Sequence, residues 1–202
     1  MNLDIYLGLG TNLGNQEKNL IDVLRLIKAN ISGANIKAVS DIFLTSPIGG
    51  IPQPDYLNCA IILSETINDS EGGESLSGAV LKLFSVFKEI EKALGRDTEI
   101  PRNSPRIIDI DILYIFDCLN KKPVALDIPG LKIPHPGIHN RKFVLIPLLD
   151  LIGKVPFIEN KIPFNEIELK KSLVELGESE SGMSQKVSLY GRFNDDFTLI
   201  SR

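Results

Sequence analysis

Two aspartates separated by one residue, Asp109 and Asp111, have the spacing in this sequence that most directly predicts chemistry. They lie in residues 106–116 (RIIDIDILYIF), an apolar segment that predicts a strand, and residues two apart in a strand share a face. Two carboxylates held this close repel each other unless a cation lies between them. Mg²⁺ prefers oxygen ligands and accepts few carboxylates when phosphates and water complete its shell. The alternative for this motif alone is an exposed strand face paired with basic side chains.

Arginines surround this motif in the sequence. Arg96, Arg102, Arg106 and Arg141 all fall within 46 residues (96–141). The guanidinium group binds phosphate oxygens in pairs and stays charged at every physiological pH. Carboxylates beside several guanidinium groups are what a complex of metal and polyphosphate requires. The alternative is a surface network of ion pairs, which would contribute little stability.

Two other motifs give weaker signals. The glycine-rich segment 8–15 (GLGTNLGN) has neither the P-loop spacing nor the dinucleotide-binding spacing, so it predicts a turn from a strand into a helix. His135 and His139 have the spacing of a zinc-binding helix, but a proline and a glycine lie between them and argue against a helix. We therefore reject zinc. His135 is either a phosphate ligand near Arg141 or an ordinary residue of a surface loop.

Three further residues suggest a binding cleft. Tyr56 and Asn58 share a strand face directly after a loop rich in proline and glycine, and an aromatic ring beside an amide suits a flat heterocycle. The alternative is an ordinary cross-strand contact. Glu91 follows Phe87 by four residues and either faces the same cleft or is a solvated position between lysines.

The spacing of apolar residues predicts the elements that must position these groups. Strands are expected at 3–10, 36–45, 56–64 and 106–116, and helices at 20–31 and 76–94. The order βαββαβ predicts the α+β class, with a ferredoxin-like core, an antiparallel sheet and the helices on one face. We expect residues 1–152 to form this domain. Residues 153–202 are expected to be a loop-rich C-terminal extension, packed on the core or tethered to it, with 177–185 as a flexible connector.

Composition narrows the class of protein. The chain has 202 residues, 43% of them hydrophobic, and a net charge of −4, which disfavours a broadly basic nucleic-acid binder. No apolar run reaches the roughly 18 residues of a membrane span. Asp4 stands where a signal peptide would have a basic residue. Two cysteines are too few for a disulfide framework. We therefore expect a cytoplasmic protein that binds neither nucleic acid nor membranes.

Several segments, in order, resemble the 6-hydroxymethyl-7,8-dihydropterin pyrophosphokinases of folate biosynthesis. They are GLGTNLGN (8–15), TSPIGGIPQPDYLN (45–58), IEKALGR (90–96), PRIIDIDILY (105–114) and IPHPGIHNRKFVLIPLLDL (133–151). The resemblance covers residues 3–151 and is specific because the aspartate segment and the histidine segment occur together. It implies transfer of pyrophosphate from ATP to the 6-hydroxymethyl group of the dihydropterin, with release of AMP.

The resemblance also implies roles for individual residues. It implies that Asp109 and Asp111 bind two Mg²⁺ ions, and that Arg96 and Arg106 join them in catalysis. The implied pterin-binding residues are Thr45, Ser46, Ile48, Tyr56, Asn58 and Phe143. The implied ATP-binding residues, with ATP as co-substrate, are Glu91, Arg96, Arg106, Ile112, His135 and Arg141. The expected partners are these small molecules, together with other enzymes of the folate pathway.

The sequence departs from the family pattern in the loop before the aspartates. Asn103 stands where a tryptophan is common, Thr98 where a second loop arginine is common, and the chain has no tryptophan at all. Two alternatives follow. One is a catalytically silent module that binds a nucleotide or a pterin, although both aspartates are retained. The other is a nucleotidyltransferase with a different acceptor, although the Gly-Ser entry motif of such enzymes is missing.

Overall fold

The computed structural model describes residues 1–49, 52–66, 75–97, 101, 103–154, 166–194 and 196–201. Its elements are β1 (Asn2–Thr11), α1 (Gln16–Asn30), β2 (Asn35–Val39), β3 (Ile42–Thr45), β4 (Tyr56–Thr66), α2 (Leu76–Ala93), β5 (Asp109–Asp117), β6 (Lys122–Pro123), β7 (Leu126–Ile128), β8 (Leu131–Ile133), the 3₁₀ turn η1 (Ile138–Asn140), α3 (Lys142–Lys154), α4 (Glu166–Glu178), α5 (Glu180–Met183), β9 (Val187–Phe193) and β10 (Leu199–Ser201).

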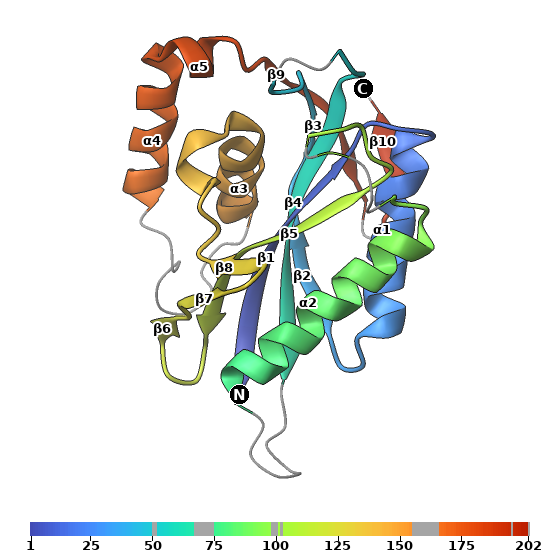
Figure 1. Cartoon of the computed structure of the whole chain (residues 1–202), viewed down its shortest axis with the longest axis vertical. Helices are drawn as coiled ribbons and strands as arrows, with labels where there is room; N and C mark the ends of the chain where they lie inside the picture. Colours follow the sequence, from blue (N-terminus) through green and yellow to red (C-terminus); the bar gives the residue numbers. More distant parts are fainter. Residues whose placement is uncertain are drawn as a thin grey trace.

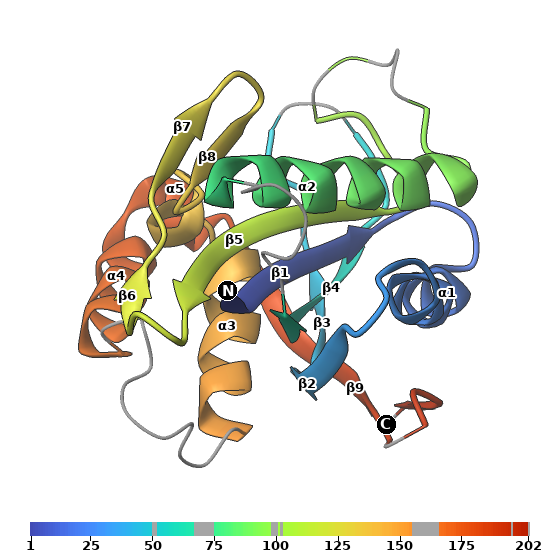
Figure 2. The ribbon, with the colours of Figure 1, turned by 90° about the horizontal axis from the view of Figure 1, so that it is seen from below.

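An antiparallel sheet is the centre of the fold, which confirms the predicted α+β class. Its strands follow the order β10-β9-β3-β4-β1-β5-β6, and β2 also pairs with β4. The two long central pairs, β1 with β4 and β1 with β5, are both antiparallel. Helices α1 and α2 cover one face, α3 covers the other, and α4 packs against α3 (Figures 1 and 2). The expectation that helices lie on one face only is therefore wrong, because the apolar segment 143–151 forms α3 and buries the second face.

The alternating residues of β1 explain both layers of the core. Leu3, Ile5, Leu7 and Leu9 are at most 1% exposed and pack among buried side chains of α1 and α2. Tyr6 points to the other face, where it meets Tyr114 edge to face and packs among residues of α3 and α4. Each fully buried leucine or isoleucine contributes roughly 1.5–3 kcal/mol. The sheet that carries the aspartates is therefore packed against apolar side chains on both faces.

Local side chains set where the two long predicted helices begin and end. The Asn15 side chain accepts from the Lys18 amide at the start of α1, and the Ser75 side chain accepts from the Gly78 amide at the start of α2. Such caps satisfy amides that have no partner inside the helix. Helix α2 ends before Gly95, whose φ of +94° suits glycine.

The predicted strand 36–45 is two strands, which corrects the sequence-based expectation. Both strands run antiparallel to β4, and the interruption between them lies at Ser40, whose amide donates to the Ala60 carbonyl at 2.8 Å. The Ser40 hydroxyl in turn accepts from the Ala60 amide at 2.8 Å. A side-chain oxygen thus replaces a backbone acceptor at this point. This interruption of the ladder separates β2 from β3.

The described part of the C-terminal segment is regular, so the expectation of a loop-rich extension is wrong there. Residues 177–185, expected to be a flexible connector, include the end of α4 and all of α5. Strand β9 pairs with the edge of β3, and Leu169 of α4 is 1% exposed against α3. Edge pairing satisfies backbone groups whatever the side chains are, so composition did not reveal it. None of the helices in the described ranges combines the length and apolar character of a membrane span.

Candidate active site

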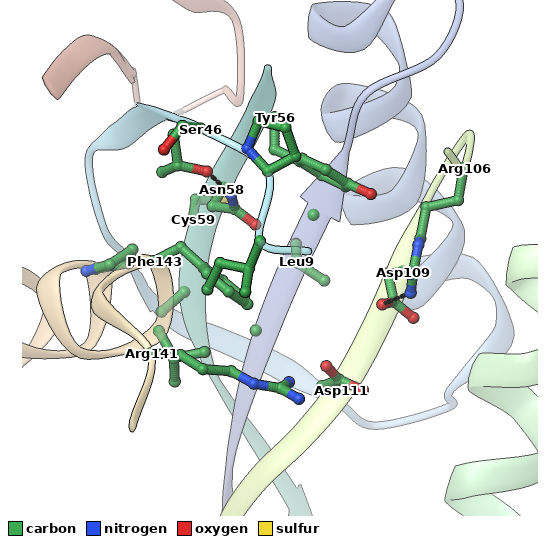
Figure 3. Close-up of a pocket in the computed structure, with 18 of the residues that line it drawn as sticks. Leu9, Ser46, Tyr56, Asn58, Cys59, Arg106, Asp109, Asp111, Arg141 and Phe143 are labelled. Carbon is green, nitrogen blue, oxygen red and sulfur yellow. Dashed lines mark hydrogen bonds and ion pairs between the residues drawn. The ribbon is translucent and has the colours of Figure 1, made fainter. Parts of the chain in front are cut away.

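Strand β5 presents its two aspartates on the face opposite the buried isoleucines. Ile108, Ile110 and Ile112 are at most 3% exposed in the core under α1 and α2, as predicted. Asp109 and Asp111 lie across β1 from Gly10 and Gly8, and both carboxylates enter the same hollow (Figure 3). The glycines have no side chains above the sheet. At these two positions, therefore, no side chain of β1 enters the hollow beside the carboxylates.

Two adjoining cavities meet at these aspartates. The first has a volume of about 240 Å³ and the second about 380 Å³. Both are lined by Asn103, Arg106, Asp109, Asp111 and Arg141. The first is otherwise lined by groups that carry no charge, and the second mostly by charged side chains. A ligand in one cavity and a ligand in the other would therefore meet at the two carboxylates.

The polar groups of the first cavity are held in place by hydrogen bonds. Asn58 Nδ2 donates to Thr45 Oγ1 at 2.7 Å, and the Tyr56 hydroxyl donates to Gln53 Oε1 at 2.9 Å. Asn58 lies opposite Gly10 in the sheet, and a Cβ on Gly10 would come within 2.6 Å of Asn58 Oδ1. Glycine at position 10 therefore allows the Asn58 amide to keep a fixed orientation.

The second cavity contains a network of ion pairs centred on Asp109 and Glu91. Arg96 pairs with one carboxylate oxygen of Asp109, and Arg106 pairs with the other. Burial raises the pKa of Asp109, but the charges of Arg106 and Arg96 outweigh it and hold that pKa below its usual value. Asp109 is therefore ionised and both of its oxygens face cations. The site gathers the positive charge that a polyphosphate needs.

Glu91 is an anchor within this network. Its Oε1 accepts from Lys88 Nζ at 2.8 Å and from the Ile110 amide at 2.7 Å, and it lies 2.7 Å from Arg96 Nη1. The side chain is only 1% exposed, and its burial raises its pKa despite the two cations. The carboxylate thus holds Arg96 at the cavity wall and ties α2 to β5.

Replacing Glu91 by alanine is expected to reduce the free energy of unfolding by about 2 kcal/mol, because Lys88, Arg96 and the buried Ile110 amide all lose their acceptor. Urea denaturation followed by circular dichroism measures this change. Glu89, exposed on the same helix, provides the matched control. Glu89→Ala should change stability by less than about 0.5 kcal/mol. Equal stability of the two variants would contradict the anchoring role of Glu91.

His135 faces the second cavity from the turn before η1. Its Nδ1 accepts from the Gly137 amide at 3.0 Å, so in the neutral ring Nε2 carries the hydrogen. Burial lowers the pKa of His135, although the charge of Asp111 opposes this. A Cβ on Gly137 would come within 3.0 Å of His135 and of Arg141, so glycine lets both side chains approach the cavity. His135 is thus a neutral donor beside Arg141.

Asp111 differs from Asp109 in its contacts with the described part of the chain. Among the described residues, no hydrogen bond or ion pair holds its carboxylate, although Arg141 points toward it (Figure 3). Burial and the negative charge of Asp109 raise its pKa. No group of three or more His, Cys, Asp or Glu side chains suited to a metal occurs within the described ranges. Two carboxylates facing an open hollow fit Mg²⁺ only if a phosphate ligand and water complete its shell.

The structure brings most of the predicted site residues to these cavities. All six predicted pterin-binding residues line the first cavity, and five of the six predicted ATP-binding residues line the second. Ile112 is the exception, because its side chain is buried in the core and lines neither cavity. Thr98 and Arg102 lie outside the described residues. His139 is exposed, and its Nδ1 lies 2.9 Å from Ser172 Oγ of α4.

Sequence reasoning missed a polar link between three loops. Gln53 Oε1 accepts from Asn12 Nδ2 at 3.0 Å as well as from Tyr56, and Gln53 Nε2 donates to the Asn103 carbonyl at 3.1 Å. Residues 12, 53 and 103 are far apart in the chain, and no local pattern pairs them. Only the meeting of the loops at one end of the sheet reveals the link.

Comparison with known proteins agrees with this geometry. The fold and site define an α+β protein with paired cavities that share two carboxylates. The family model described as 7,8-dihydro-6-hydroxymethylpterin-pyrophosphokinase matches residues 6–153. The chain belongs to this family, and the resemblance stated from its motifs is confirmed.

Curated relatives and solved structures extend the comparison. A 2-amino-4-hydroxy-6-hydroxymethyldihydropteridine pyrophosphokinase of Bacillus subtilis is 32% identical over 155 residues, which cover 77% of this chain and 81% of that protein. A folate synthesis bifunctional protein of Arabidopsis thaliana is 34% identical over 159 residues. This match covers 79% of the chain and only 29% of the Arabidopsis protein. Wild-type Plasmodium falciparum HPPK-DHPS shares the fold with a TM-score of 0.59 and 16% identity, over 99% of this chain and 49% of that one.

Proposed function

We propose that this protein transfers the pyrophosphoryl group of ATP to the 6-hydroxymethyl group of 6-hydroxymethyl-7,8-dihydropterin and releases AMP, a step of folate biosynthesis. The observation that carries the proposal is the pair of adjoining cavities that share Asp109, Asp111, Arg106 and Arg141. A flat heterocycle suits the first cavity and a polyphosphate suits the second. Family membership and the Bacillus subtilis relative support the same activity.

In the first cavity, the heterocycle would lie between two aromatic side chains, Phe143 and Tyr56. The Asn58 amide and the Thr45 and Ser46 hydroxyls would pair with its ring nitrogens and its oxygen. Because Thr45 and Gly10 fix the orientation of Asn58, the site rejects a heterocycle with the wrong pattern of donors and acceptors. The substituent on carbon 6 would then point toward the aspartates.

In the second cavity, the triphosphate would lie along the basic wall. Arg106 and Arg141 donate to phosphate oxygens, Arg96 is held in place by Glu91, and neutral His135 donates from Nε2. The hydroxymethyl oxygen attacks the β-phosphorus, the bond from that phosphorus to the bridging oxygen of the α-phosphate breaks, and AMP leaves. The hydroxyl proton passes to solvent. Catalysis is then alignment of the two reactants and neutralisation of charge.

Asp109 and Asp111 would hold two Mg²⁺ ions. These ions would neutralise phosphate charge and make the hydroxymethyl group more acidic. In the free chain, Arg96 and Arg106 occupy both oxygens of Asp109. These two arginines would exchange the carboxylate for phosphate oxygens on nucleotide binding. The free site is thus preassembled with its charges paired internally.

The test is an assay of purified chain with ATP, Mg²⁺ and 6-hydroxymethyldihydropterin, in which AMP and the pterin pyrophosphate are both measured. One AMP per pterin pyrophosphate supports the proposal. Tight ATP binding without AMP would favour a silent binding module instead. Release of pyrophosphate with transfer of AMP to an acceptor would favour a nucleotidyltransferase.

Asn103 offers a separate prediction about nucleotide release. Its φ of +63° is in the left-handed region, and it lines both cavities. Asn103→Trp is expected to slow ATP dissociation about fivefold, because the indole would cover the phosphates. The same change should cost only about 1–2 kcal/mol of stability from the strained backbone. Asn103→Gly, which tolerates this φ, is the control for stopped-flow release. An unchanged ATP off-rate in the tryptophan variant would contradict the prediction.

The proposal also includes the type of core and the protein partners. The strands β3-β4-β1-β5 are neighbours in the order of a ferredoxin-like core, which supports that assignment for residues 1–152. Contact with other enzymes of the folate pathway is supported by relatives in which a matching segment is part of a bifunctional protein.

A further inference from the structure

The segment just before β9 contacts the first cavity from outside the residues that the family model matches. The Ser46 amide donates to the Lys186 carbonyl at 3.0 Å, and the Lys186 amide donates to Ser46 Oγ at 2.9 Å. Ser46 Oγ also donates to the Ser184 carbonyl at 3.3 Å. These bonds fasten one wall of the cavity to the C-terminal segment.

Gln185 fastens the opposite wall. Its side chain is 5% exposed, and its Oε1 accepts from the Lys142 amide at 2.8 Å. Its Nε2 donates to the carbonyls of Asn140 at 3.4 Å and Ser181 at 3.3 Å. Gln185 therefore connects η1, the start of α3 and α5 through one buried amide.

The bond to Lys142 matters because it lies at the first residue of α3. The first amides of a helix have no acceptor within the helix, and a side chain from elsewhere in the chain can supply one. Lys142 stands between Arg141, which lines both cavities, and Phe143, which lines the first. The Arg141 guanidinium also lies 5.7 Å from the centroid of the Phe143 ring. An acceptor at Lys142 thus fixes the backbone that carries both side chains.

We propose that Gln185 is a positioning residue for the heterocycle, and that the C-terminal segment completes the first cavity. The proposal rests on the proposed function for its substrate. Gln185 acts through the Lys142 amide to orient Arg141 and Phe143. Its neighbours Ser184 and Lys186 hold the Ser46 wall through their backbones. The two walls of the cavity are thereby set at a fixed separation by three consecutive residues.

The test compares two variants that each remove one bond between the C-terminal segment and the rest of the chain. Gln185→Met keeps the length and the apolar stem of the side chain but loses the amide. Tyr190→Phe is the matched control, because the Tyr190 hydroxyl on β9 donates to Glu17 of α1, away from α3. Both variants loosen the docking of the segment, but only the first one frees the start of α3.

Two measurements separate the positioning role from a general loss of stability. In Gln185→Met, we expect the Lys142 amide to exchange with solvent about tenfold faster, and the KM for the dihydropterin to rise about tenfold, as loss of one hydrogen bond implies. We expect kcat to stay within about twofold of wild type, since the reacting groups are untouched. Tyr190→Phe should leave both the exchange and the KM unchanged. Equal KM values for the two variants, or a loss confined to kcat, would overturn the proposal.

The exchange measurement stands without the enzymatic one. If the wild-type chain makes no AMP, the proposed function fails, and exchange at Lys142 alone decides whether Gln185 caps α3. If Gln185→Met does not fold, the wild-type chain supplies the comparison. Its Lys142 amide must be protected, whereas the next amide, that of Phe143, donates to no acceptor among the described residues and must exchange fast. Equal exchange of these two amides would overturn the cap and the proposal with it.

Discussion

Asp109→Asn and Asp111→Asn are each expected to lower kcat/KM by about 1,000-fold or more, because each removes a negative charge that holds a cation beside the polyphosphate. Asparagine keeps the shape of the side chain and an oxygen, so the cavities remain. The measurement is AMP formation over a range of Mg²⁺ concentrations. A higher Mg²⁺ requirement in both variants would identify the lost function as cation binding.

The same two variants should change stability in opposite directions. Asp109 is paired with Arg96 and Arg106, so Asp109→Asn removes two ion pairs and lowers the free energy of unfolding. Burial and the charge of Asp109 raise the pKa of Asp111. A raised folded-state pKa means that ionised Asp111 costs stability at neutral pH, and that this cost disappears as the pH falls and the group is protonated. Asp111→Asn should therefore stabilise the free chain at neutral pH and lose this advantage in acid.

An exposed carboxylate supplies the control for both variants. Asp127 pairs with Lys132 on the β7–β8 hairpin, and its side chain is 73% exposed. Asp127→Asn should leave turnover, Mg²⁺ requirement and stability unchanged. Near-normal turnover in either site variant would rule out a cation held between the two carboxylates. Destabilisation by Asp111→Asn at neutral pH would show that the like-charge repulsion is absent.

The parts of the site that follow a local rule could be predicted from the sequence. The period of two in a strand places Asp109 and Asp111 on one face and their isoleucine neighbours in the core. Helical geometry likewise explains the apolar spacing of α1 and α2. It also explains why α2 ends before Gly95. Tyr56 and Asn58 lie on one strand for the same reason. Where a single helix or strand determines the position of a side chain, residue types and spacing were enough to predict that position.

The parts that depend on pairing between distant segments could not be predicted. Strand β9 joins the sheet through backbone hydrogen bonds to β3, and these bonds do not depend on residue type. Gln185 looks like any polar residue in a serine-rich stretch, yet its amide caps a helix 43 residues away in the chain. The two-residue period of β5 predicts that Ile112 lies on the core face. Its side chain is buried there and therefore does not line the cavities. Its predicted contact with ATP came from resemblance alone.

Arg106→Ala is expected to lower kcat/KM about 100-fold. The Arg106 guanidinium faces both cavities, so it can leave the Asp109 carboxylate and pair with phosphate oxygens when the nucleotide binds. The fold should survive this change, since the backbone of residue 106 is held independently. Its amide donates to Asn12 Oδ1 at 2.7 Å, and its carbonyl accepts from the amides of Asn12 and Leu13. Arg106→Lys keeps the charge but loses the paired donors, so it should recover only part of the activity, to within about tenfold of wild type.

The pH dependence of Arg106→Ala distinguishes a catalytic charge from a merely structural one. Burial raises the pKa of Asp109, and Arg106 is the largest influence that lowers it. Without Arg106, that pKa rises, so the carboxylate is protonated at a higher pH and the acid limb of kcat/KM should move upward in pH. Arg25→Ala, on the exposed face of α1, should move neither the rate nor the acid limb. An acid limb that stays in place while the rate falls would assign Arg106 to phosphate binding alone, because its charge would then have no effect on the ionisation of Asp109.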